Sequence, residues 1–316
     1  MSGPPTAPGD LRYLCRQDVA SVLPGTLEQL DIVEQTYLAM AEGRVEQPPK
    51  PGIHPRPDAF IHAMPVYLAD EDVAAMKWVS GYPENRSRGL PYISGLVIVN
   101  DPATGVPLAI MDAVEITAAR TAAASGVCIR RWAPPGWRRA AILGCGEQGR
   151  YHAKLLRALN PEVRIAAWDP DASRVAAMPG PVEAAGDPHA AVDGADVVVT
   201  CAPIVEEAQA TLTSAGSGAP RLLLPIDFDA SIGAALVRAA DLLVVDDVTQ
   251  FEYYRDRGHF RDWPAPDLST GEALRDGRGG TSVVCCNLGV GALDAAFASH
   301  ALRAADREEA FITLPR

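Results

Sequence analysis

The stretch RRAAILGCGEQGRYHAKLL, residues 138–156, decides the fold of this chain of 316 residues. Its first half is a short apolar run that ends in glycines, and its second half has the apolar spacing of a helix. Gly144, Gly146 and Gly149 spell G-x-G-x-x-G across that junction. In a dinucleotide site the first glycine allows a tight turn, the second lets the backbone approach a pyrophosphate, and the third lets helix and strand pack closely. The stretch therefore predicts a dinucleotide-binding turn.

An acidic residue follows at the spacing that such a site uses. Asp169 ends the next apolar run, RIAAWD, 20 residues after Gly149. A carboxylate at this position binds the adenosine ribose hydroxyls, and it would repel a 2′-phosphate. We therefore expect NAD(H) rather than NADP(H), although Arg174 could soften that preference. The alternative is a glycine turn that binds no nucleotide.

The runs that follow predict the architecture. ADVVVTCAP, LLLPID and DLLVVDD begin at residues 195, 222 and 241. Strands this apolar are buried on both faces, which is typical of a parallel sheet covered by helices. We predict an α/β fold with a Rossmann-type doubly wound parallel sheet. The first 120 residues are proline-rich, with short strand-like runs and a helix at 26–43, and predict an α+β domain.

The predicted boundaries place an NAD-binding Rossmann domain at 121–280. Residues 1–120 together with 281–316 form a substrate-binding and dimerisation domain, and an alanine-rich helix at 115–132 links the two. The segment FEYYRDRGHFRDW, residues 251–263, is aromatic and charged, and is either a lid or a surface helix.

Composition excludes several classes of function. The chain has 40 acidic and 28 basic residues, a net charge of −12, which disfavours nucleic-acid binding. It contains no run of 18 uncharged apolar residues, so we expect no membrane span. Its six cysteines form no CxxC pair, which argues against a zinc site or disulfide scaffold and favours a reducing cytoplasm. We expect no metal.

Three positions outside the glycine turn carry candidate chemistry. Lys77 lies within the strand-like run AAMKWVS, so it either faces solvent at an edge or is buried against a charge. Arg120 lies in the small, apolar stretch ITAARTAAAS, where the alternative is a salt bridge. Asp227 and Asp229 follow LLLPI at the carboxyl end of a strand, where α/β sheets bind ligands; the alternative is a turn or helix cap.

Several stretches together resemble the ornithine cyclodeaminase/mu-crystallin family of NAD(P)-dependent enzymes. They are FIHAMPVYL, MKWVSGYPEN, GLVIVNDPATGVPLAIMD, ITAARTAAASG and GCGEQGRYHAKLL, and the resemblance extends from about Leu11 to the last helix. It implies that Arg56, Lys77 and Arg120 hold a substrate carboxylate. Lys77 would also donate or accept a proton, and Asp229 would face the substrate amine or an attacking water.

The resemblance also implies a cofactor site, a partner and a reaction class. The residues at the dinucleotide would be Thr121, Gly144, Gly146, Glu147, Gln148, Gly149 and Asp169. The family's chemistry is hydride transfer at an α-amino carbon through an imine, and its fold implies a homodimer. In cyclodeaminases the hydride returns after ammonia is lost, whereas in alanine dehydrogenases and ketimine reductases it stays on the product. Mu-crystallin-like proteins can also serve as non-catalytic dinucleotide- or ligand-binding proteins.

Two departures from the family pattern bear on the substrate. His62 stands where cyclodeaminases that act on ornithine have a glutamate, and PIDFDASIG, residues 225–233, replaces Gly-Ala-Asp-x-Pro-Gly-Lys. His62 is either a solvent-facing strand residue or a second cation for a dicarboxylic imine such as iminosuccinate. The sequence thus predicts an NAD(H)-dependent imine reductase or amino-acid dehydrogenase for a small α-imino or α-amino acid. The alternatives are an ornithine cyclodeaminase and a non-catalytic binding protein.

Overall fold

The computed structural model describes residues 10–205, 210–213 and 222–315. The chain divides into two compact units. Unit 1 is built from the chain up to Pro24, Gly43–Thr117 and the chain from Gly291, and unit 2 from Gly25–Glu42 and Ala118–Val290. Helix α3 (Ala113–Trp132) contains one of the boundaries between these units. Among the described residues, no helix combines the length and apolar character needed to span a bilayer.

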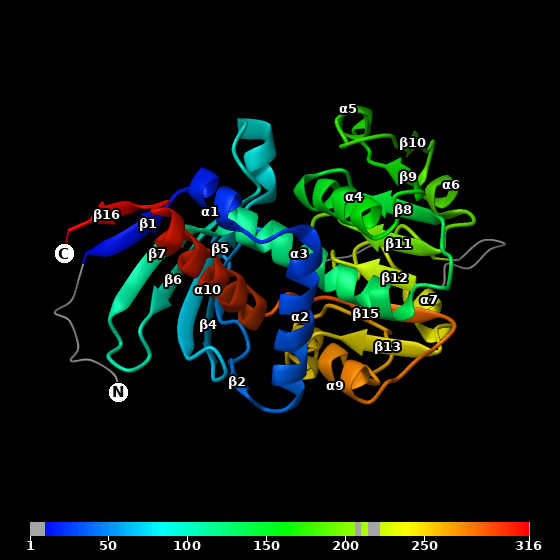
Figure 1. Ribbon diagram of the computed structural model, residues 1–316. Coiled ribbons are helices and arrows are strands. Elements are labelled where there is room, and N and C mark those ends of the chain that lie inside the picture. Colours follow the sequence, from blue (N-terminus) through cyan, green and yellow to red (C-terminus); the bar gives the residue numbers. More distant parts are fainter. Residues whose placement is uncertain (1–9, 206–209, 214–221, 316) are drawn as a thin grey trace. The chain divides into compact units, whose positions relative to one another are not determined.

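Unit 1 is an α+β unit around one mixed sheet (Figure 1). Its strands run in the order β16-β1-β7-β6-β5-β4-β2, with β3 also paired to β4, and only β1 and β7 pair in parallel. The strands are β1 (Leu11–Leu14), β2 (Val45–Glu46), β3 (Gly52–Ile53), β4 (Phe60–Leu68), β5 (Val73–Gly81), β6 (Ile93–Asn100), β7 (Pro107–Asp112) and β16 (Ile312–Leu314). The helices are α1 (Arg16–Val22), a 3-10 turn η1 (Pro83–Arg88) and α10 (Gly291–Glu308).

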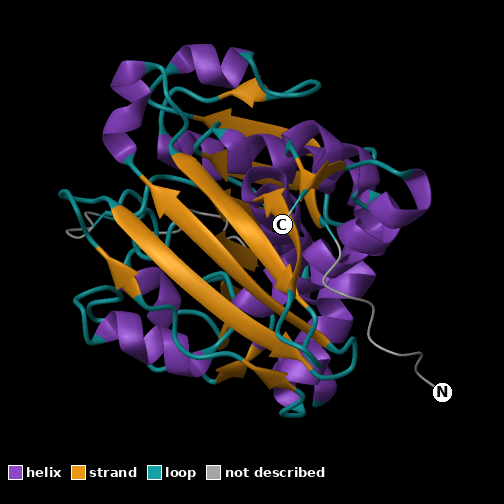
Figure 2. Ribbon diagram, turned by 90° about the vertical axis from the view of Figure 1, so that its left-hand side faces the viewer, coloured by secondary structure: helices purple, strands orange, loops and turns teal. Residues whose placement is uncertain are grey.

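The two faces of this sheet differ. Helix α10 packs across β4, β5 and β6, and the strand residues beneath it alternate, with Met64 and Val66 buried on β4 and Lys77 and Val79 buried on β5. On the other face, Trp78 lies directly opposite Leu96 of β6, and both side chains are exposed. Figure 2 views unit 1 with its long strands in the foreground. Period-two alternation therefore places Lys77 on the inner face.

Unit 2 confirms the predicted doubly wound α/β fold. Its eight strands run in the order β10-β9-β8-β11-β12-β15-β13-β14, and every pair is parallel. The strands are β8 (Arg139–Leu143), β9 (Arg164–Trp168), β10 (Glu183–Ala184), β11 (Val197–Thr200), β12 (Leu222–Pro225), β13 (Leu242–Val245), β14 (Leu268–Ser269) and β15 (Val283–Cys286). The helices are α2 (Thr26–Ala41), α4 (Glu147–Leu159), α5 (Ala172–Ala176), α6 (Pro188–Val192), α7 (Ala234–Arg238), α8 (Val248–Arg255) and α9 (Thr270–Arg275).

Two segments belong to a different unit from the one predicted. The predicted boundary at residue 281 placed β15 with the first domain, but β15 is fully buried and pairs with both β12 and β13. Helix α2 packs against α9 of unit 2, where a Cβ at Gly271 would lie 2.0 Å from the carbonyl oxygen of Tyr37. Only a glycine allows so close an approach, so α2 is part of unit 2.

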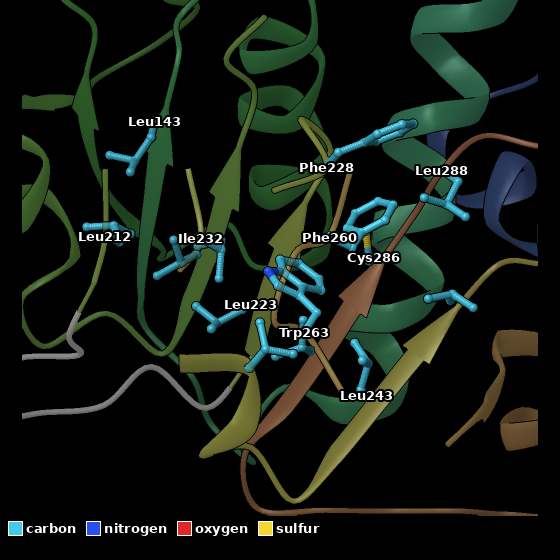
Figure 3. Close-up of a cluster of buried hydrophobic side chains, with 14 of the residues drawn as sticks. Leu143, Leu212, Leu223, Phe228, Ile232, Leu243, Phe260, Trp263, Cys286 and Leu288 are labelled. Carbon is cyan, nitrogen blue, oxygen red and sulfur yellow. The ribbon is translucent and has the colours of Figure 1, made fainter. Parts of the chain in front are cut away.

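The aromatic segment at 251–263 begins within helix α8 (Val248–Arg255) and packs its aromatic rings inward. Its Phe251, Tyr254, Phe260 and Trp263 are buried in a hydrophobic cluster of unit 2, and Figure 3 shows Phe260 and Trp263 within that cluster. The ring centroids of Phe251 and Phe260 are 4.4 Å apart in a stacked arrangement. The charged residues between these aromatic side chains are less buried. For that reason the sequence alone resembles that of a surface segment.

Candidate functional site

The glycine turn of unit 2 has the geometry that a dinucleotide site needs. Gly144 has a φ of +94°, and a Cβ there would lie 2.6 Å from the carbonyl oxygen of Cys201. A Cβ at Gly149 would lie 2.2 Å from the carbonyl oxygen of Gly144, so helix α4 packs directly on the turn. Gly146 is the N-cap of α4 and offers no side chain to its first amides. Those amides are available to an anion.

Asp169 is fixed beside this turn. It is only 8% exposed; Oδ2 accepts from the Cys145 amide at 2.8 Å and Oδ1 from the Asp171 amide at 2.9 Å. A cavity of about 540 Å³ adjoins it and is also lined by Trp168 and Met178. Each carboxylate oxygen retains a second lone pair for a ligand hydroxyl. Arg174 lies 3.4 Å from Asp171, with which it forms an exposed ion pair.

The remaining predicted cofactor residues lie on α3 and on the first turn of α4. Thr121 is buried, whereas Glu147 is exposed. The side-chain oxygen of Gln148 is buried and has no hydrogen-bond partner among the described residues. A buried polar atom of this kind is costly unless something pairs with it. The orphaned oxygen, the open helix end and the fixed carboxylate all fit a bound dinucleotide.

Lys77 of unit 1 is buried against a charge, the second of its two predicted arrangements. The residue is 2% exposed, and Nζ lies 2.7 Å from Oδ2 of Asp294 on α10. Nζ also lies 3.4 Å from the Thr117 hydroxyl on α3. Sequence reasoning did not identify Asp294, because it lies more than 200 residues away in the chain. The pair therefore places a lysine and its counter-ion together inside unit 1.

His62 lies on the inner face of β4, not toward solvent. It shares that face with Met64, which stands directly opposite Lys77. Burial lowers the pKa of His62 to about 3, and the charges of Lys50, His54 and Lys77 add to the effect. The imidazole is therefore neutral at pH 7 in the ligand-free protein. The second cation that we predict here for a dicarboxylic imine is thus neutral while no anion is bound, because burial and like charge oppose protonation.

A cation that the sequence analysis missed accompanies His62. Lys50 lies in the proline-rich segment before β3 and is only 8% exposed, and its charge acts on the His62 ring. Arg56, the predicted carboxylate ligand, is exposed, and its Nη1 donates to the carbonyl of neighbouring Pro55 at 2.6 Å. A lysine in a non-periodic segment gives no sequence signal of burial.

The amino end of α10 adds to the positive potential in unit 1. A Cβ at Gly291 would lie 3.2 Å from the carbonyl oxygen of Met64, so the helix begins directly over β4. The Ala292 amide donates to the side-chain oxygen of Gln47 at 3.1 Å. A helix N-terminus carries a partial positive charge, which Asp294 in the first turn offsets in part. The region is therefore suited to an anionic ligand.

Arg120 and Asp229 both lie in unit 2. Arg120 is 6% exposed, and its guanidinium packs against Gly289, where a Cβ would lie 2.7 Å from Nη1. Asp229 Oδ2 accepts from the Phe260 amide at 2.6 Å, and Oδ1 lies 3.5 Å from Nδ1 of His259. Asp229 thus has a fixed orientation. Among the described residues, no group of three or more His, Cys, Asp or Glu side chains is arranged to hold a metal ion.

Solved structures share this fold. Thermococcus litoralis Δ1-pyrroline-2-carboxylate reductase, in complex with NADH and L-proline, superposes with a TM-score of 0.82 at 22% identity, covering 96% of this chain and 99% of that one. The iminosuccinate reductase of Paracoccus denitrificans, in complex with NAD+, gives a TM-score of 0.79 at 21% identity, covering 97% and 100%. At these identities the likeness establishes the fold alone.

Comparison of the sequence with those of known proteins identifies relatives more specifically than the shared fold does. The chain is 37% identical over 302 residues to the nodulation efficiency protein NfeD of Rhizobium meliloti, covering 92% of this chain and 93% of that protein. It is 33% identical over 156 residues to the alanine dehydrogenase of Archaeoglobus fulgidus, covering 49% and 47%. Residues 13–217 match the family model described as the ornithine cyclodeaminase/mu-crystallin family. The chain therefore belongs to the ornithine cyclodeaminase/mu-crystallin family, as its motifs predicted.

Proposed function

We propose that this protein is an NAD(H)-dependent imine reductase or amino-acid dehydrogenase that acts on a small α-imino or α-amino acid. The observation that carries the proposal is the buried Lys77–Asp294 pair of unit 1, together with the buried Lys50, whose charge acts on His62. A storage or scaffolding protein does not need a fully buried lysine, which is costly to desolvate.

The proposed cofactor residues are those of the glycine turn. The uncapped amides at the start of α4 would bind the pyrophosphate, and Asp169 would accept from the adenosine ribose hydroxyls. The charge of Asp169 favours NAD(H) over NADP(H). When bound, NADH would supply the hydride that reduces an imine carbon. The relatives solved with NADH or NAD+ support this choice of cofactor.

The proposed substrate contacts follow from charge. The family resemblance assigns Arg56, Lys77 and Arg120 to the α-carboxylate, and within unit 1 we add the buried Lys50 to Lys77 as a second ammonium for it. Lys77 Nζ would hold the proton that the substrate nitrogen gains, with Asp294 keeping the ammonium ionised before transfer. General acid catalysis of this kind contributes about 10²–10⁴-fold to a rate. Asp229, held by the Phe260 amide, would orient the amine.

The substrate that these charges favour is dicarboxylic. His62 is neutral when no anion is present, because burial and neighbouring cations lower its pKa. A second carboxylate beside the ring would reverse the sign of that local field and favour the imidazolium, which would then pair with it. Iminosuccinate is a substrate of this chemical class.

The ornithine cyclodeaminase alternative is disfavoured by the same charges. The second amino group of ornithine would meet Lys50 and His62, and His62 stands where cyclodeaminases that act on ornithine carry a glutamate. The segment PIDFDASIG also lacks the family's lysine in this loop.

We also propose that the protein is a cytoplasmic homodimer. The outer face of the unit 1 sheet carries Trp78 and Leu96, which are 44% and 40% exposed and stand directly opposite each other. A paired apolar surface of this kind is typical of an interface. A second copy of the chain would cover it.

Absorbance of NADH tests the proposed reaction. Purified protein is given NADH, ammonium and oxaloacetate, pyruvate or glyoxylate in turn. We expect NADH loss that requires both ammonium and the oxo acid, and that is fastest with oxaloacetate. A parallel reaction contains L-ornithine and NAD, with proline measured by mass. Proline formation without net change in NADH would refute the reductase and establish the cyclodeaminase.

A further inference from the structure

A fully buried carboxylate joins two loops of unit 2 at the carboxyl ends of β11 and β12. Asp227 is 0% exposed. Its Oδ1 accepts from the Thr200 hydroxyl at 2.5 Å, and its Oδ2 accepts from the Ser231 hydroxyl at 2.6 Å and the Ala202 amide at 2.9 Å. All three donors are neutral. Burial raises the pKa of Asp227 to about 6, although these hydrogen bonds oppose the rise.

The first of the two loops supports the glycine turn. Asp227 holds the amide of Ala202, and the carbonyl of the same peptide unit, that of Cys201, lies against Gly144. A Cβ at Gly144 would meet this carbonyl oxygen at 2.6 Å and the Ala202 nitrogen at 3.2 Å. The position of this peptide therefore sets the position of the turn that we assign to the pyrophosphate.

The second loop carries Asp229. Between the two aspartates, Phe228 adopts a φ of +59°, a left-handed conformation that is unfavourable for a phenylalanine. Its ring is held by Tyr254 and Phe260, with centroids 5.0 and 5.3 Å away, and Figure 3 shows it within the aromatic cluster. Strain of this kind persists only where the surroundings fix it. Asp227 anchors one side of the strained turn and the aromatic cluster anchors the other.

We propose that Asp227 is a positioning residue that sets NADH affinity and the orientation of Asp229 together. It acts through the Ala202 peptide on the glycine turn and through Ser231 on the turn that presents Asp229. The inference rests on the proposed function, since it assumes that NADH binds at the glycine turn. It assigns a role to Asp227, an acid that the family's Gly-Ala-Asp-x-Pro-Gly-Lys pattern does not contain.

Asp241 offers a control carboxylate with the same number of donors, in an exposed position. Asp241 also accepts three hydrogen bonds from neutral donors, namely the Thr281 amide and hydroxyl and the Ser282 amide. It lies at the amino ends of β13 and β15, the opposite edge of the sheet from the glycine turn. Asp241→Ala therefore removes three loop hydrogen bonds of the same kind, at an exposed position whose partners are Thr281 and Ser282 rather than the proposed cofactor residues.

The test measures the dissociation constant of NADH by its fluorescence, with kcat and thermal unfolding of each variant. Asp227→Ala leaves buried hydrogen-bond donors unpaired, which costs free energy. We therefore expect this variant to bind NADH about tenfold more weakly or worse. We expect kcat to fall as well. Asp227→Asn keeps an acceptor for Ala202 and Ser231, so it should bind NADH within about threefold of the wild type. Asp241→Ala should lower thermal stability without changing NADH affinity.

Hydrogen exchange of the cofactor-free protein gives a readout that is independent of activity. Asp227→Ala should speed exchange in peptides covering residues 200–203 and 227–233, and Asp241→Ala should do so only near residues 281–282. If Asp227→Ala should fail to fold, Ser231→Ala removes one donor and should give the same pattern at smaller amplitude. Equal NADH affinity in Asp227→Ala and Asp241→Ala would overturn the inference. Failure of the wild-type protein to bind NADH would instead overturn the proposed function.

Discussion

Removing Asp294 should destabilise unit 1 by an amount that only a buried ion pair can explain. The side chains of Lys77 and Asp294 are 1% and 2% exposed, and their charged atoms are 2.7 Å apart. Asp294→Ala leaves an ammonium without its counter-ion in a place that water does not reach. Breaking a buried pair in this way costs about 3–5 kcal/mol, which is a large share of a typical folding free energy.

The measurement is urea unfolding of Asp294→Ala, Asp294→Leu, Lys77→Met and the double variant Lys77→Met with Asp294→Leu. The two partners lie in the same unit, so the loss should appear in the transition of unit 1. With a slope of about 3 kcal/mol per molar urea, a loss of 4 kcal/mol lowers the midpoint by about 1.3 M. The double variant should recover most of the loss, because an apolar pair removes both desolvation costs.

An exposed ion pair of the same unit is the control. Arg88 and Glu84 are 3.6 Å apart, with side chains 65% and 79% exposed. Glu84→Gln should change the free energy of unfolding by less than about 1 kcal/mol. If Asp294→Ala costs no more than Glu84→Gln, or if the effects of the Lys77 and Asp294 substitutions simply add, the argument from burial is refuted.

Four further predictions concern other sites. Asp169→Asn removes the charge that opposes a 2′-phosphate, so the preference for NADH over NADPH should fall by about tenfold in fluorescence titrations; an unchanged ratio would place the discrimination elsewhere. His62→Ala should reduce kcat/KM for oxaloacetate with ammonium far more than for pyruvate, whereas equal losses would exclude a contact with the second carboxylate. Trp78→Glu places a charge on the outer face of the unit 1 sheet and should yield monomers in sedimentation equilibrium; a wild-type mass would argue against this interface. Burial lowers the pKa of His152 to about 4, below its usual value near 6.5, so the free energy of unfolding should fall by up to about 3 kcal/mol as pH drops from 6.5 to 4. His152→Gln should remove this part of the pH dependence, and an identical slope in the variant would contradict it.

The parts of the fold that were predicted correctly depend on local patterns. The glycine turn, the apolar runs and the helix α2 each follow from residues that are close in the chain. The errors concern which unit a segment joins. The run VVCC of β15 is a short apolar strand in any context, and its place between β12 and β13 depends on hydrogen bonds to strands far away in sequence. Single-sequence periodicity carries no such information.

The residues of the candidate site likewise fall into those that local spacing predicts and those that it does not. Spacing was enough to place Asp169 at the end of a strand next to the glycine turn. It was not enough to find Lys50, which lies among prolines, or Asp294, which meets Lys77 only after α10 folds back over β4 and β5. Burial of a charged side chain is a property of the surroundings, and those surroundings come from several separate segments.

The register of β4 against β5 links the stability of unit 1 to its proposed chemistry. Met64 stands opposite Lys77, and His62 stands opposite Val79, so both polar side chains lie on the face that α10 covers. A shift of one residue along β5 would turn Lys77 to the outer face and bring Trp78 to the inside. The alternation that buries Val79 therefore also places Lys77 beside Asp294. The apolar core of this sheet and the proposed proton donor depend on the same strand pairing, so substitutions that loosen the pairing should reduce stability and turnover together.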